Sequence, residues 1–563
     1  RYAAHALAVV NQNIVELLQL TSIYNALQLS NVLQFTCGCD SRAAQSVLEE
    51  LISLSSKEFV NLQPEHLDKP GWLLPVPVSR RMWACAETYR QFVLLCLDII
   101  TERQESDVLN AVSRALPFLV LFQFNNRKRQ AAFKYYLETI QSLELPARMI
   151  LRPAHINHIK PFVQYLEELF TSPIPGLRLD LRTGFEPFMS PEQTIRLISV
   201  LKNVPALRAL DMSSSNLTPS SLQPLVRGFR HISLLEELDV SCNTLGDDGI
   251  RVLQFGLSSI PHLAVLRLSS VGMTAVGMLF MAPYMRRLTR LTELDVSGNG
   301  IGDIGLEILT AFLFFLTAMQ VLTVRNTGIS PAGIRALVPA LAKLNGLIKL
   351  NVSDNAIGDD GLECLINILP LLPAMRVLVL REIRISDKGI SALVKALPHL
   401  LELQVLDVGF NYIGDSGIVS LVQTLGQPLS LKTEQTPPGD KSLPTAPRYN
   451  TKLRELHMGH NTGVTGAGLG RVARHIHALP ALTKLDMSGF QLSHAYLRDT
   501  AAMDLAGALP KLPVLEWLML GNICMDRAGF QAVVQATEEH TTLVKLQYDR
   551  SGLPPGADTS ARY

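Results

Sequence analysis

The hydrophobic pattern over most of the chain repeats at a fixed interval. The pattern Leu-x-x-Leu-x-Leu, in which Val or Met replaces some leucines, opens at Leu207, Leu235, Leu263, Leu291, Met319, Leu347, Met375 and Leu403, always 28 residues apart. It resumes at Leu453, Leu482, Leu515 and Leu543 after a longer gap. A glycine also follows 14 residues after each opening residue from Leu235 to Leu403, so two independent markers define the repeat.

Each repeat changes its periodicity partway along. Residues 238–240 read Leu-Asp-Val, an alternation typical of a short strand with one buried face. Apolar residues in 250–257 then recur at helical spacing. Aspartates such as Asp303 and Asp359 stand at the start of these helices, where we expect them to cap free amides. Stacked units of this kind predict an α/β solenoid, a right-handed horseshoe with parallel inner strands and outer helices.

Every second repeat from Leu235 to Leu403 carries an asparagine eight positions after its opening residue, and so does the next repeat, which opens at Leu453. An asparagine here can satisfy backbone groups of the turn that leaves the strand, so we expect a structural role. These structural asparagines are Asn243, Asn299, Asn355, Asn411 and Asn461. Apolar residues or threonine occupy the position in the intervening units, which indicates two alternating unit types and a true period of 56 residues.

The stretch 235–250, Leu-Glu-Glu-Leu-Asp-Val-Ser-Cys-Asn followed by Thr-Leu-Gly-Asp-Asp-Gly-Ile, resembles known leucine-rich repeats. The similarity is to ribonuclease inhibitor, innate-immune receptors and the Ran GTPase activator, and the alternation of two unit types resembles ribonuclease inhibitor most. The resemblance implies a protein that binds other proteins. The alternate cysteines of ribonuclease inhibitor, the nucleotide-binding loop of the sensors and the acidic tail of the Ran activator are missing, so no ligand is carried over.

The pattern divides the chain into successive parts. We expect an all-α N-terminal domain over 1–170, a capping or degenerate first repeat over 171–206, regular repeats over 207–426, a Pro-rich inserted loop over 427–450, C-terminal repeats over 451–550 and an irregular tail over 551–563.

The residue between the two strand leucines is expected to point into the concave face, and aspartate dominates there. With the flanking positions, the expected partner-binding residues are Asp211, Glu237, Asp239, Arg267, Glu293, Asp295, Asn351, Asp407, Glu455, Asp486 and Trp517. Their acidity favours a basic segment of a partner protein. Alternatively, these aspartates hydrogen-bond the neighbouring strand, as is common in such repeats, and the sequence leaves both readings open.

Composition narrows the class of protein. Apolar residues form 47% of the chain, charged residues 18%, and the formal net charge is +1, so we expect a soluble globular protein without nonspecific grip on nucleic acid or anionic lipid. Nucleic acid is expected only within a larger assembly. Residues 306–324 are nearly all apolar, but the repeat register assigns them to a buried helix, turn and strand, so no membrane span is expected.

The cysteines bear on compartment and on catalysis. Seven cysteines, mostly isolated in apolar stretches, favour reduced thiols in an intracellular compartment, either cytoplasmic, including cytoskeletal or flagellar, or the mitochondrial matrix. Cys37-Gly-Cys39-Asp40 is the one candidate for a nucleophile or metal ligand, but no partner residues with suitable spacing accompany it. We therefore expect no catalytic residue, metal, cofactor or small-molecule substrate.

The function that these features favour is a non-catalytic protein-protein interaction scaffold, a structural or assembly subunit that binds other protein subunits through the solenoid and the helical domain. Two alternatives remain. One is a regulatory leucine-rich-repeat protein, GTPase-activator-like or sensor-like. The other is the substrate-selecting part of a ubiquitin-ligase-like enzyme.

Overall fold

The computed structural model describes residues 20–39, 41–59, 88–89, 91–99, 119–121, 148–151, 178–182, 196–197, 200–205, 207–427, 452–489, 495–497 and 499–548. The chain forms two compact units, residues 1–271 and 272–563. The predicted loop, apart from Gln427, and the predicted tail lie outside the described residues. None of the helices among the described residues is long and apolar enough to cross a membrane.

The first unit begins with helices, as predicted. These are α3 (Ile23–Gln28), α4 (Ser30–Cys39), α5 (Ser41–Glu58) and the helical residues at 88–89 and 91–99. Their core contains aromatic rings: Phe59 and Tyr89 meet edge to face with centroids 4.9 Å apart, and Phe92 lies 5.8 Å from Phe59. Cys37 of the cysteine motif is fully buried in this region, while the side chain of Cys39 and all of Asp40 lie outside the described residues.

Parallel strands begin earlier than predicted. Strands β1 (Leu119–Leu121) and β2 (Arg148–Leu151) pair in parallel within the range predicted to be all helical, and β3 (Arg178–Arg182) pairs with β2. The sequence does not predict β1, because a short apolar run fits a buried strand and a buried helix equally well. The helical part is therefore shorter than 1–170.

The regular repeats of the first unit follow. Strands β4 (Ala209–Asp211), β5 (Glu237–Asp239) and β6 (Val265–Arg267) are parallel and in register, with helices α12 (Pro219–Gly228) and α13 (Gly246–Leu257) between them. Each strand begins two residues after the opening leucine of its repeat. Strand leucines such as Leu238 and Leu266 are fully buried beneath the helices.

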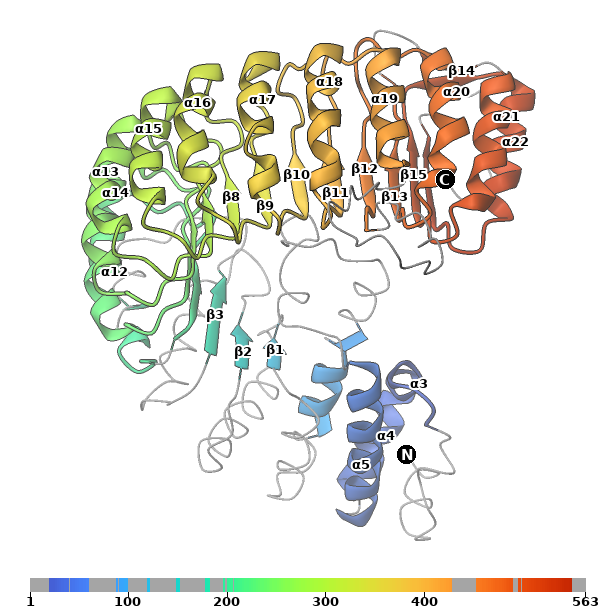
Figure 1. Ribbon diagram of the computed structural model, residues 1–563. Helices are drawn as coiled ribbons and strands as arrows, with labels where there is room; N and C mark the ends of the chain where they lie inside the picture. Colours follow the sequence, from blue (N-terminus) through green and yellow to red (C-terminus); the bar gives the residue numbers. More distant parts are fainter. Residues whose placement is uncertain are drawn as a thin grey trace, which may run out of the picture. The chain divides into compact units, whose positions relative to one another are not determined.

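The second unit repeats the same strand and helix alternation, with the helices on one side of its sheet (Figure 1). Its helices are α14 (Ala275–Met285), α15 (Gly302–Leu313), α16 (Pro331–Leu341), α17 (Gly358–Ile366), α18 (Asp387–Ala396), α19 (Asp415–Leu425), α20 (Gly466–His475), α21 (Asp499–Ala508) and α22 (Arg527–Glu538). Its parallel sheet contains β7 (Glu293–Asp295), β8 (Val321–Thr323), β9 (Lys349–Asn351), β10 (Val377–Val379), β11 (Val405–Asp407), β12 (Glu455–His457), β13 (Lys484–Asp486), β15 (Trp517–Leu520) and β17 (Lys545–Tyr548). Strands β14 (Ala495–Leu497) and β16 (Ile523–Met525) form a separate parallel pair. The predicted α/β solenoid is confirmed.

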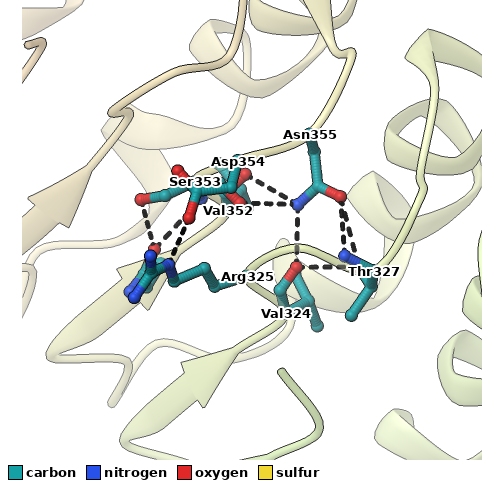
Figure 2. Close-up of polar contacts among 8 residues, drawn as sticks. Val324, Arg325, Thr327, Val352, Ser353, Asp354 and Asn355 are labelled. Carbon is teal, nitrogen blue, oxygen red and sulfur yellow. Dashed lines mark hydrogen bonds and ion pairs between the residues drawn. The ribbon is translucent and has the colours of Figure 1, made fainter. Parts of the chain in front are cut away.

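The asparagines join consecutive repeats through backbone groups. Asn355 Nδ2 donates to the carbonyl oxygens of Val324 (2.8 Å) and Val352 (2.9 Å), one in each of two repeats (Figure 2). Its Oδ1 accepts from the amides of Thr327 (3.0 Å) and Ile329 (3.2 Å) in the preceding repeat. One side chain thus serves two turns, which explains why the repeats between Asn243, Asn299, Asn355 and Asn411 need no asparagine of their own. Asn461 follows Asn411 in the very next repeat and accepts from its amide. Comparable bonds are made by Asn243, Asn299, Asn411 and Asn461.

An aspartate near the start of one helix caps the next helix. Asp303, in the first turn of α15, accepts with Oδ1 from the amides of Ser330 (2.8 Å) and Gly333 (3.1 Å) at the start of α16. Asp359 and Asp387 serve α18 and α19 in the same way. The prediction that these aspartates cap their own helices is wrong, because packed helices lie only about 8–10 Å apart. The next helix start is therefore within reach of the carboxylate.

The repeat glycine is explained by the same contact. A Cβ at Gly333 would lie 2.4 Å from Asp303 Oδ1, and one at Gly389 would lie 2.4 Å from Asp359 Oδ1. In the other unit type the obstacle differs: a Cβ at Gly305 would lie 2.6 Å from the Cβ of Ile301. Any larger residue would displace the helix start.

Candidate protein-interaction surface

The side of each sheet away from the repeat helices is the side predicted to be concave, and we call it the strand face. The second and fourth residues after each opening residue lie on it in two rows. In the second unit one row pairs Glu455 with Lys484 and Lys484 with Trp517, in register across β12, β13 and β15. The other row pairs Asp407 with His457 across β11 and β12.

A network of ion pairs, the His457 cluster, occupies these strands. It comprises Asp407, Glu455, His457, Lys484 and Asp486, of which His457 lies in register between the two aspartates. Glu455 Oε1 lies 2.6 Å from Lys484 Nζ, and its Oε2 lies 3.4 Å from His457 Nε2. The side chains of Glu455 and Lys484 are only 10% and 21% exposed, so this pairing is largely shielded from solvent.

The pKa values of the cluster reflect that pairing. Burial alone would raise the pKa of Glu455, but the hydrogen bond from His457 and the charge of Lys484 outweigh it and lower the pKa. Burial would lower the pKa of His457, yet Glu455 and Asp407 raise it. Burial raises the pKa of Asp407 despite the nearby His457.

Trp517 lies beside the His457 cluster between two lysines. Lys484 Nζ lies 5.1 Å and Lys545 Nζ lies 4.7 Å from the centroid of the Trp517 ring, distances at which cation–π attraction operates. The buried Trp517 Nε1 has no hydrogen-bond partner among the described residues. The N–H is shielded from solvent, so the part of this half-buried indole that a partner can contact is its exposed ring surface.

The first unit shows a more strongly acidic arrangement. Asp211 and Asp239 are in register on β4 and β5, and Arg267 is in register with Asp239 on β6. Burial, followed by repulsion from Asp211, raises the pKa of Asp239 to about 6, although Arg267 acts in the opposite direction. Glu237 precedes this row on the same strand.

The aspartates of the strand face bind their own chain locally. Asp239 Oδ1 accepts from the amide of Ser241 at 2.9 Å, and Asp295 Oδ1 accepts from that of Ser297 at 2.9 Å. The same bond, to the amide two residues later, is made by Asp211, Asn351, Asp407 and Asp486. The predicted bond to the neighbouring strand is therefore replaced by one within the turn, because a short side chain reaches the amide two residues on.

The strand face of the second unit is not uniformly acidic. Its predicted acids, Glu293, Asp295, Asp407, Glu455 and Asp486, lie in the two rows, and the cations Lys349, Lys484 and Lys545 lie in the first of these rows. Two more cations, Arg325 and Arg381, stand two residues beyond the second row. These cations were not predicted, because the prediction used mainly the residue between the two strand leucines, which forms the second row. Stacking the flanking columns in register would have shown Lys484 opposite Glu455. A basic segment is thus not favoured as the partner of this unit.

Other candidate chemistry is not assembled by the described residues. They contain no group of three His, Cys, Asp or Glu side chains that could hold a metal ion. Burial, with smaller effects of Cys37 and Asp98, raises the pKa of the Cys96 thiol far above its ordinary value, as expected of an inert thiol.

Comparisons with known proteins concern the repeats. The family model described as "Leucine Rich repeat" matches residues 231–253, 288–309, 347–365, 401–422 and 449–473. The solved structures similar to this chain include an internalin, inlF, from Listeria monocytogenes, with 17% identity, 70% of this chain and 92% of that chain covered, and a TM-score of 0.38. They also include the TLR13–ssRNA13 complex, with 18% identity, 70% and 55% coverage, and a TM-score of 0.32. No curated protein matches the sequence.

Proposed function

This chain is a leucine-rich-repeat protein, and we propose that it is a non-catalytic scaffold, of the ribonuclease-inhibitor-like class, that holds another protein subunit of a larger assembly. The strand face of β11 to β17 is the proposed binding surface. The observation that carries this proposal is Trp517, whose half-buried indole lies on the strand face between the ammonium groups of Lys484 and Lys545.

Several physical arguments support binding at Trp517. Tryptophan is enriched among the residues that dominate interface energies, and a rigid sheet loses little conformational entropy on binding. The neighbouring charges Glu455 and Lys484 already pair with each other, so a partner need not neutralise them. A partner that packs an apolar group against the exposed part of the indole and places a carboxylate next to the exposed Lys545 would fit these groups.

The alternative functions have less support. The ubiquitin-ligase-like reading depends on Cys39, whose side chain lies outside the described residues, while its neighbour Cys37 is fully buried. No observation favours the GTPase-activator-like or sensor-like reading. The free thiols of Cys37, Cys96, Cys242, Cys364 and Cys524 support the proposal of a reducing, intracellular compartment.

The test is affinity capture of the full chain from its native source, with quantitative mass spectrometry and a Trp517→Ala variant. We expect the variant to bind its partner at least about tenfold more weakly. The matched control is Met503→Ala, which removes a half-exposed apolar side chain from the helical side. Retention of every partner by Trp517→Ala and by Lys545→Glu, with both variants folded by circular dichroism, would contradict the proposal.

A further inference from the structure

The outward faces of α14 and α15 differ from those of α17 and α18. In α17 and α18 the exposed positions are polar, namely Asp360, Glu363, Lys388, Ser391 and Lys395. The register-equivalent positions of α14 and α15 include apolar residues that are largely exposed: Val276 (50%), Leu279 (59%), Ile304 (67%) and, just beyond the end of α15, Phe314 (45%) and Phe315 (50%). We call these five residues the outer apolar patch.

The apolar residues of α15 form a continuous outward stripe. Ile304, Ile308, Ala311 and Phe315 are spaced by four, three and four residues, which places them on one side of the helix. The opposite side, including Leu309, is buried against the sheet. The prediction that burial between repeats accounts for all of residues 306–324 is therefore wrong for Phe314 and Phe315. A helix that is apolar all round is normally covered on both sides.

Cations surround the outer apolar patch. Arg286 and Arg287 follow the end of α14, and Arg335 and Lys343 are exposed on and just after α16. The Arg286 guanidinium carbon lies 5.3 Å from the centroid of the Phe315 ring, so the cations and the patch adjoin.

Acids are scarce around the same patch. On the outward side of α15 the exposed acid is Glu307. Asp303, at the start of that helix, is occupied by the cap of α16, where its carboxylate accepts from Ser330 and Gly333. The rim of the outer apolar patch is therefore positively charged.

We propose that the outer apolar patch binds an acidic amphipathic helix of a partner protein. The stripe matches the spacing by which a helix recognises another apolar helix face, and the cationic rim is complementary to acidic residues flanking the partner's apolar stripe. This is a second docking surface on the helical side, and it does not depend on the strand face around Trp517.

Two other occupants fit the charges less well. A second copy related by a two-fold axis would bring the cationic rim against the same rim, because such an interface uses one patch twice. A bilayer would have to accommodate Glu307 within the apolar stripe, next to Ile304 and Ile308. A protein helix can instead leave Glu307 in solvent at the edge of the contact.

The experiment measures binding of synthetic peptides to the full chain by fluorescence anisotropy. The probe is a labelled peptide of about 18 residues, roughly five helical turns, with leucines at three- and four-residue spacing and glutamates elsewhere. The matched peptide carries lysine in place of each glutamate. We expect the glutamate peptide to bind at least about tenfold more tightly than the lysine peptide.

Variants localise the binding. The double variant Ile304→Ser with Phe315→Ser is expected to lose the glutamate peptide by at least about tenfold, whereas Leu371→Ser, which alters an equally exposed leucine outside the patch, should bind normally. Arg286→Glu with Arg287→Glu should reverse the preference toward the lysine peptide. The strand-face variant Trp517→Ala should bind both peptides as the parent does, which separates this test from that of the proposed function.

The contrary outcomes are equally defined. Equal binding of both peptides, or binding unaffected by the Ile304 and Phe315 changes, overturns the proposal. So does sedimentation of the parent chain, but not of that double variant, with vesicles of phosphatidylcholine and phosphatidylserine, since the patch would then be a membrane contact. Dimerisation of the parent that the double variant abolishes, seen by sedimentation velocity, would assign the patch to a second copy.

Discussion

The strand face around Asp239 on β4 to β6 and the strand face around Glu455 on β11 to β13 shift the pKa values of these two carboxylates in opposite directions. In the first, Asp239 lies in register with another acid, Asp211, and its pKa is raised to about 6. In the second, Glu455 lies in register with Lys484 and its pKa is lowered. Burial acts to raise the pKa of both carboxylates; the hydrogen bond from His457 and the charge of Lys484 outweigh it at Glu455, whereas Arg267 does not outweigh it at Asp239.

The two regions differ in whether neighbouring charges oppose or favour folding. Like charges directly opposite each other cost stability in a sheet, so the Asp211 and Asp239 pair is retained against its own repulsion. In the His457 cluster, His457 and Lys484 favour the charged form of Glu455, whereas burial still raises the pKa of Asp407. Both regions nevertheless rest on the same asparagine contacts, which gives a common reference for variants in either.

The largest expected effect comes from that common reference. Asn411 is fully buried, donates to the carbonyl oxygens of Leu380 (2.9 Å) and Val408 (3.0 Å), and accepts from the amides of Ile383 and Ile385. Asn411→Ala leaves these backbone groups without partners and should lower the free energy of unfolding by about 3 kcal/mol or more. Urea unfolding followed by circular dichroism measures this loss.

Asn243→Ala gives the matched measurement in the first unit, where Asn243 makes the corresponding bonds to Met212 and Leu217. Losses of similar size would show that the backbone framework is shared and that only the charged rows differ. A loss below about 1 kcal/mol in either variant would mean that water or a shifted turn replaces the asparagine.

The fold was readable from the sequence because its signals are local and repeated. The opening leucines place each strand from β4 to β11 two residues later, and the asparagines mark alternate turns. Strands β1 and β2 were missed, since their repeats lack the full leucine pattern and a short apolar run such as 118–122 suits either helix or strand. The prediction was therefore wrong where the repeats are degenerate, at β1 and β2.

The surface was less readable because its properties depend on pairs one repeat apart. The sequence showed Asp407 and Glu455 as acids, but their pKa values depend on His457 and Lys484 across the sheet. In the same way, the aspartate cap at Asp303 acts on the following helix. Such contacts appear only after the repeats have been laid in register.

The next largest effect should come from removing the cation of the His457 cluster. Lys484→Met keeps much of the apolar stem but leaves Glu455 without the ion pair at 2.6 Å. Because both side chains are partly shielded, we expect a loss of about 1–2 kcal/mol in the free energy of unfolding at neutral pH. Denaturant titration at low and high salt measures it.

Lys395→Met is the control for the loss of a lysine charge, because Lys395 is exposed on the outward side of α18. We expect this control to change stability by less than about 0.5 kcal/mol. Equal losses in the two lysine variants would show that the pairing with Glu455 contributes nothing specific.

The smallest effect, of opposite sign, is expected in the first unit. Because folding raises the pKa of Asp239 to about 6, the folded chain binds this proton more tightly than the unfolded chain. The associated stability is present below about pH 4 and is lost as the pH rises through 6. Asp239→Asn, which can still accept from the Ser241 amide, should therefore stabilise the chain by about 1 kcal/mol at pH 7.5 and have little effect at pH 4.

Glu455→Gln should instead destabilise the chain at pH 7.5. Because folding lowers the pKa of Glu455, its carboxylate stabilises the fold at pH values above the ordinary pKa of a glutamate, and that stability is lost as the pH falls. Unfolding curves of both variants at the two pH values decide the matter: if both shift stability in the same direction at pH 7.5, the contrast between the two regions is wrong.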